Sequence, residues 1–113
     1  MRNGKYGVAD KADRTGEDGF VYDSKREMLV FGQLCLLQRA GIIRGLERQV
    51  RYDLHATGPL GAKTKVCSYV ADFRYVDLDG RVTVSDAKGV RTALYKLKRK
   101  WMEIEYHIRI LEQ

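Results

Sequence analysis

The chain has 113 residues, which suits one domain with a core of its own. Lysine and arginine total 21 against 15 aspartate and glutamate residues, and the net charge of +6 favours an anionic partner, with nucleic acid ahead of an acidic membrane surface. Cys35 and Cys67 have no metal-type spacing, which argues against a zinc cluster or a disulfide framework. The polar start and the lack of an apolar run near ~20 residues predict a cytoplasmic protein with no membrane partner.

The N-terminal part differs in composition from the rest of the chain. Residues 1–18 are rich in glycine, lysine and aspartate and show no apolar period, so a flexible arm is expected there. Residues 19–113 are expected to form a single domain, and the first of them, 19–22, can pair as a short strand.

The first helix is predicted over residues 24–40. Ser24 stands three residues before Glu27, which is the capping-box spacing, and apolar residues then recur at helical intervals. Gly41 suits the left-handed conformation that often ends a helix. Glu27 shares a helical face with apolar residues, so its carboxylate can point inward, and the capping role and the inward role compete for one side chain.

Strand signals fill the middle of the chain. A strand is expected over 42–54, with Gly45 as a turn or bulge. The stretch 65–77 is dense in Val, Tyr and Phe, and Asp79-Gly80 is a hairpin-turn signal. The remaining elements are predicted as a loop over 56–62, a returning strand over 81–88 that stops at Gly89, a helix over 91–104 and a short strand over 107–111.

The second helix carries apolar residues at helical spacing, and this stripe is expected to face the core. The stripe consists of Leu94, Leu97, Trp101 and Ile104. The order of helix, three strands, helix and strand predicts an α/β (α+β) protein.

Two aspartates are expected to face each other across the predicted hairpin. Asp72 and Asp86 stand at equal spacing on either side of Asp79, so antiparallel pairing brings them nearly opposite, and Lys88 shares the face of Asp86. Facing carboxylates repel unless a divalent cation joins them, and oxygen ligands favour Mg²⁺, with Mn²⁺ as a substitute. The alternative is that both aspartates face solvent and that Lys88 pairs with one of them.

These residues resemble the motif of the PD-(D/E)XK nuclease superfamily, and the wider pattern is similar to its small phage-encoded, Holliday-junction-resolvase-like members. The segments that carry the resemblance are Gly19–Glu27, Leu46–Val50, Tyr69–Phe73 and Asp86–Gly89, with Thr92, Tyr95 and Lys96. Ala71 stands where the motif has proline, and Asp86 stands where glutamate is more frequent. The resemblance implies a nuclease domain with a restriction-endonuclease-like core and a mixed central sheet.

The resemblance also implies a role for each matching residue. Asp72 and Asp86 would hold the metal together with the backbone carbonyl of Ala87, and Lys88 would assist the attacking water. Glu27 would reach the metal from the first helix, directly or through water.

Further polar residues are candidates that each have a structural alternative. Gln49 lies among apolar neighbours and would orient substrate or water, or serve as a buried structural amide. A basic helix can contact DNA phosphates or simply form a solvated face. The candidates for phosphate contacts are Arg91, Thr92, Lys96, Lys98, Arg99 and Lys100.

The leading expectation is a Mg²⁺-dependent endodeoxyribonuclease of the cytoplasm, or of the host cytoplasm if phage-encoded. Branched DNA is the narrower expectation for its substrate, and symmetric cutting of a junction calls for a homodimer. The main alternative is a non-catalytic basic nucleic-acid-binding module on the same fold. A third reading is a small interaction protein whose basic helix binds an acidic protein partner.

Overall fold

The described residues of the computed structural model are 14, 24–87 and 91–113. The arm expected over 1–18, apart from Arg14, and the strand expected over 19–22 lie outside them. Lys88 and Gly89 lie outside them as well.

The chain forms an α+β fold around one mixed four-stranded sheet. The elements are α1 (Lys25–Arg39), β1 (Arg44–Thr57), β2 (Lys63–Val76), β3 (Val82–Asp86), α2 (Ala93–Tyr106) and β4 (Leu111–Glu112). The strands lie in the order β1-β2-β3-β4, the first three antiparallel and β4 parallel to β3. The predicted order of elements and the mixed sheet are therefore confirmed. Neither helix has the length and apolar composition that a membrane crossing requires in the described part of the chain.

The ends of α1 follow local sequence signals. The Ser24 hydroxyl accepts a hydrogen bond from the backbone amide of Glu27 at 3.1 Å, which caps the helix. Gly41 has a φ of +79°, the left-handed geometry that suits glycine after a helix. The predicted boundaries of 24–40 are confirmed to within one residue at each end.

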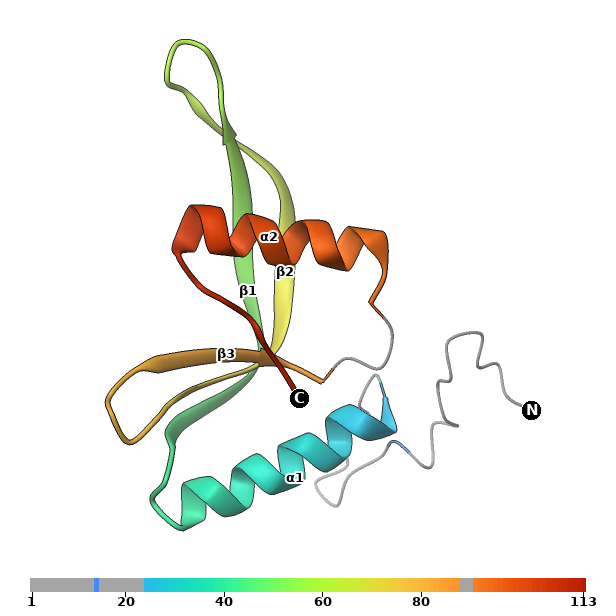
Figure 1. Ribbon diagram of the computed structural model, residues 1–113, viewed down its shortest axis with the longest axis vertical. Coiled ribbons are helices and arrows are strands. Elements are labelled where there is room, and N and C mark those ends of the chain that lie inside the picture. Colours follow the sequence, from blue (N-terminus) through green and yellow to red (C-terminus); the bar gives the residue numbers. More distant parts are fainter. Residues whose placement is uncertain (1–13, 15–23, 88–90) are drawn as a thin grey trace, which may run out of the picture.

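The β1–β2 hairpin is longer than the sequence signals predicted. Thr57 pairs with Lys63, so the expected loop over 56–62 is reduced to its last five residues, 58–62. Gly45 has a φ of +64° and lies where the register with β2 shifts, so the predicted bulge is confirmed. In Figure 1 the far end of this hairpin extends well beyond α2.

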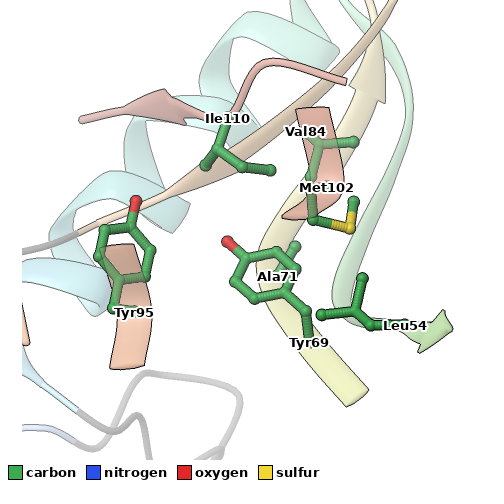
Figure 2. Packing of buried hydrophobic residues seen from close by; sticks show 7 residues of the cluster. All are labelled: Leu54, Tyr69, Ala71, Val84, Tyr95, Met102 and Ile110. Carbon is green, nitrogen blue, oxygen red and sulfur yellow. The ribbon is translucent and has the colours of Figure 1, made fainter. Parts of the chain in front are cut away.

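Two clusters of buried side chains form the core. The cluster beneath α2 contains Leu54, Tyr69, Ala71, Val84, Tyr95, Met102 and Ile110, which Figure 2 shows together. The cluster beside α1 contains Val30, Leu34, Ile43, Phe73, Tyr75 and Ala87. Ala71 and Phe73 belong to different clusters although only Asp72 separates them, so β2 passes from one core to the other at Asp72.

The inward face of α2 was predicted correctly only at Trp101, which is partly buried and packs against the core cluster beneath the helix. Leu94, Leu97 and Ile104 are 59%, 56% and 67% exposed, whereas Tyr95 and Met102 are buried. The helix docks through Tyr95 because its hydroxyl donates to Glu112 at 2.8 Å, and this bond satisfies a polar group inside the core. The apolar period identified the helix but not the side that faces the sheet.

The C-terminal strand was also placed wrongly. The chain leaves α2 at His107, whose φ of +58° is left-handed, and β4 comprises only Leu111 and Glu112. The strand expected over 107–111 is therefore displaced towards the C-terminus, where it pairs in parallel with the end of β3. A two-residue strand has too little period to be seen in a sequence.

Candidate functional site

Strand β1 bends next to the two predicted aspartates. Arg48 pairs with Phe73 and Val50 with Ala71, so Gln49 lies across from Asp72. Gln49 has a φ of +56°, which is uncommon for a residue other than glycine. Such conformations gather at functional sites, where the surrounding structure holds them in place.

Asp72 and Asp86 are held against each other by their strands' backbones. The amide of Asp72 donates to Oδ1 of Asp86 at 2.8 Å, and the amide of Ala87 donates to Oδ2 of Asp72 at 2.9 Å. Each carboxylate is thus fixed by the other strand, which is the opposition that the hairpin spacing predicted.

Asp86 is 0% exposed, an unusual position for a carboxylate. Its Oδ2 accepts a hydrogen bond from the hydroxyl of Tyr69, a residue that the sequence did not single out. Burying an ionised carboxylate costs free energy unless hydrogen bonds or a cation compensate. The Tyr69 hydroxyl and the Asp72 amide provide two such bonds, and a buried carboxylate fixed in this way is a candidate functional group.

Glu27 joins the same region from the start of α1. It is 2% exposed, and its Oε2 accepts a hydrogen bond from Nε2 of Gln49 at 3.0 Å. Its backbone amide meanwhile donates to Ser24. The capping role and the inward role of Glu27 therefore coexist. Its backbone amide binds the capping hydroxyl of Ser24, and its side chain points inward to Gln49. Gln49 itself is exposed, so of its two interpretations the buried structural amide is the one that the structure disfavours.

The donor set suits a small hard cation. Among residues 24–87 and 91–113 no three His, Cys, Asp or Glu side chains form a metal-binding group. Mg²⁺ commonly binds through one or two carboxylates and keeps several waters. Asp72 and Asp86, with the carbonyl of the adjoining Ala87, are oxygen donors of that kind, and the residues present fit the ion on that chemistry. Lys88 follows Ala87 directly but lies outside the described residues.

The left-handed backbone of Gln49 gives a prediction on stability. We expect Gln49→Gly to change the free energy of unfolding by no more than about 1 kcal/mol, because glycine accepts a positive φ and offsets the lost hydrogen bond. Gln49→Val should cost about 1–3 kcal/mol more, since a β-branched residue is strained there. Urea unfolding checks both values. Arg51→Val on the same strand is the control, and an equal loss there would contradict the prediction.

The predicted phosphate-binding residues of α2 have different surroundings. Thr92 caps the helix, since its hydroxyl accepts from the amide of Tyr95 at 3.1 Å. Arg91 and Arg99 both pair with Glu112, at 2.7 and 2.6 Å. Lys100 pairs with Glu103 at 3.2 Å. The last two candidates, Lys96 and Lys98, form no ion pair with the described residues.

Glu112 is a functional candidate that sequence reasoning missed. It pairs in register with Asp86 across β3 and β4 and accepts from the hydroxyl of Tyr95. Burial raises the pKa of the Tyr95 hydroxyl well above its usual value, and the hydrogen bond to Glu112 raises it further, so Tyr95 stays a donor. An acidic residue near the end of the chain carried no sequence signal for this position.

Glu112 gives a prediction on pH. Burial raises the pKa of its carboxyl, but hydrogen bonds from Tyr95, Arg91 and Arg99 outweigh burial and leave the pKa lowered. A lowered folded-state pKa contributes stability above the unfolded value, near about 4.3, and this is lost as pH falls through the folded value. We expect Glu112→Gln to weaken the protein at pH 7 and to flatten its acid destabilisation.

Urea unfolding at pH 7 and at about pH 3 measures this effect. Glu47→Gln is the control, because Glu47 is exposed and pairs with Arg74 only at 3.8 Å. Parallel stability profiles for Glu112→Gln and the wild type would contradict the stabilising role of Glu112.

One comparison with known proteins gave a match. A family model described as "Protein of unknown function (DUF1064)" matches residues 5–111. No curated protein matches the chain, and no solved structure does.

Proposed function

We propose that this chain, which belongs to the DUF1064 family, is a metal-dependent endonuclease that hydrolyses DNA phosphodiester bonds. The observation that carries the proposal is the mutual fixation of Asp72 and the fully buried Asp86 across β2 and β3. The order of elements and the Asp86-Ala87-Lys88 sequence support it, because both are similar to the PD-(D/E)XK superfamily.

In this proposal each residue of the site has a separate role in hydrolysis. Mg²⁺, with Mn²⁺ as a substitute, would stabilise negative charge as it develops on the scissile phosphate. Asp72, Asp86 and the Ala87 carbonyl would hold the ion, and the hydrogen bonds between the strands fix each carboxylate against the backbone of the other strand. Lys88 would orient the attacking water.

Glu27 and Gln49 form the flank of this site. The buried carboxylate of Glu27 fixes the exposed amide of Gln49 through their 3.0 Å hydrogen bond. Gln49 lies across β1 and β2 from Asp72, so its amide is positioned to hold water or a substrate oxygen. In this proposal Glu27 acts on the metal through water or through Gln49.

DNA is the proposed substrate because the chain is basic overall and residues 91–100, which include the first half of α2, carry five cations and no acidic residue. Lys96 and Lys98 are the strongest candidates for phosphate contacts, while Arg91, Arg99 and Lys100 would first exchange their carboxylate partners for phosphate. Branched DNA is the narrower proposal and needs two active sites, hence a homodimer. Leu29 and Leu36 on α1 are exposed and supply apolar surface for it.

Cleavage assays with matched aspartate variants test the proposal. Wild type is expected to cut linear or branched DNA with Mg²⁺ and to stop in EDTA, and Asp72→Asn is expected to be inactive in both. Asp79→Asn, at the tip of the same hairpin, is the control that should stay active. Equal activity of the wild type and Asp72→Asn would refute this site.

The second candidate function is non-catalytic nucleic-acid binding. It is favoured by the lack of a three-residue metal group among the described residues. It predicts strongly salt-dependent binding that needs no metal and survives Asp72→Asn. Titration calorimetry with Mg²⁺ separates the two functions, because only the nuclease requires a metal site that this substitution destroys.

We further propose that the chain acts in the cytoplasm, or in the host cytoplasm if it is phage-encoded. Cys35 and Cys67 are both free thiols, which suits a reducing compartment. Fractionation of expressing cells tests the location.

A further inference from the structure

The end of the β1–β2 hairpin carries a leucine that has almost no contact with its own chain. Leu60 is 98% exposed and stands next to Pro59 in the loop 58–62. Figure 1 shows that this end of the hairpin reaches far past α2. A single exposed leucine is ordinary on a protein surface. A functional role for Leu60 therefore has to be argued from the conformation of the loop that carries it.

The loop holds Leu60 at a well-defined apex. The amide of Gly58 donates to the carbonyl of Ala62 at 2.8 Å, and the amide of Gly61 donates to the carbonyl of Gly58 at 3.0 Å. Gly61 has a φ of +88°, which a leucine or lysine would not readily adopt. With strand pairing up to Thr57 and Lys63, the apex is the closed end of a continuous ladder.

Positive charge begins directly behind this apolar apex. Residues 56–62 carry no charged side chain, and Lys63 and Lys65 follow on β2. Their side chains are 63% and 47% exposed, and each forms a long ion pair, Lys63 with Glu105 at 3.6 Å and Lys65 with Asp53 at 3.5 Å. The tip therefore presents an apolar apex followed by two lysines that can exchange their carboxylate partners for phosphates.

That arrangement matches a partner with an apolar interior and an anionic exterior. Stacked bases behind a phosphate backbone are such a partner, and proteins that open base steps insert Leu, Ile, Met, Phe or Pro between them. The stack opens most easily where it is already interrupted, as at a branch point.

We propose that Pro59 and Leu60 form a wedge that enters the base stack of DNA at a branch point, with Lys63 and Lys65 on the flanking phosphates. The proposal takes DNA as the partner from the proposed function, but it does not depend on cleavage. Leu60 and Asp72 are 12 residues apart along the chain (72 − 60). At about 3.3 Å per residue the wedge lies at most about 40 Å from Asp72, roughly twelve base-pair steps.

The test measures unstacking directly, without cleavage. A four-way DNA junction carries 2-aminopurine at the branch point, and a linear duplex carries it in the same sequence. The full chain is added in Ca²⁺ or EDTA, with 2-aminopurine fluorescence and binding anisotropy as readouts. Leu60→Ala and Leu60→Phe are compared with Leu78→Ala, which changes an exposed leucine at the other hairpin turn.

We expect the wild type, Leu60→Phe and Leu78→Ala to raise the fluorescence of the junction. Leu60→Ala should lose most of this rise and bind the junction about tenfold more weakly, with little change on the linear duplex. A rise that survives Leu60→Ala overturns the wedge, and so does failure of the wild type to bind the junction.

Two further results distinguish the DNA wedge from the proposed nuclease activity and from a lipid-binding role of the tip. Retained, Leu60-dependent unstacking in a protein that never cleaves DNA in Mg²⁺ would refute the nuclease and support the wedge. Binding to anionic phosphatidylglycerol vesicles that is lost in Leu60→Asp, with no effect of Leu60 on DNA, would assign the tip to a lipid surface and overturn the wedge.

Discussion

Under the proposed nuclease function, Asp86→Asn is expected to lower the rate of Mg²⁺-dependent DNA cleavage by about 10³-fold or more, because it would remove a charge proposed to hold the metal and with it several kcal/mol of transition-state stabilisation. The fold should survive the change. An asparagine oxygen can still accept from the amide of Asp72, and its NH₂ group can donate to the Tyr69 oxygen in place of the bond that Asp86 accepts. The variant thus separates the charge of Asp86 from its hydrogen bonds.

Single-turnover cleavage and urea unfolding of the same preparations measure the two effects independently. Asp53→Asn is the matched control, because Asp53 lies on β1 but is about half exposed and pairs with Lys65. The control should cleave DNA at close to the wild-type rate. Full activity of Asp86→Asn would show that the buried aspartate is structural and would remove the main support for the proposed nuclease.

The aspartate pair could be predicted because it depends on local rules. A tight turn at Asp79-Gly80 fixes the register of β2 and β3, and register fixes which residues lie opposite, so equal spacing from the turn was enough to pair Asp72 with Asp86. The cap at Ser24 was predictable for the same reason, since it involves residues within one helical turn.

The surroundings of Asp86 could not be predicted because they depend on a bend in the sheet. Alternation along β2 places Tyr69 on the face opposite to Asp72, yet its hydroxyl reaches Asp86. The strand changes core between Ala71 and Phe73, beside the left-handed Gln49. Glutamine has no preference for that conformation, so no sequence signal indicated the bend.

The orientation of α2 was missed for a related reason. A hydrophobic stripe predicts the buried side of a helix only when apolar contact decides the docking. Here the side of α2 that faces the sheet includes Tyr95. Its hydrogen-bond partner Glu112 comes from the short β4, which follows α2 in the chain. Three residues of the apolar stripe, Leu94, Leu97 and Ile104, consequently lie outside the core, whereas Trp101 packs against it.

The core beside the site gives the largest expected effect on stability. Phe73 is fully buried, stacks on Phe31 with ring centroids 5.9 Å apart, and directly follows Asp72 on β2. We expect Phe73→Ala to lower the free energy of unfolding by about 3–5 kcal/mol, because it removes a buried ring and leaves a cavity between α1 and the sheet. That loss is a large part of the roughly 5–15 kcal/mol that holds a domain folded.

Urea unfolding followed by circular dichroism measures this loss, and Phe73→Leu keeps the test informative if the alanine variant does not fold. The leucine variant should lose about 1.5 kcal/mol or less, since most of the volume is retained. Leu94→Ala on the exposed side of α2 is the control and should stay within about 0.5 kcal/mol of the wild type. A larger cost for Leu94→Ala than for Phe73→Leu would mean that the apolar stripe of α2, and not the cluster beside α1, is the surface that stabilises the protein.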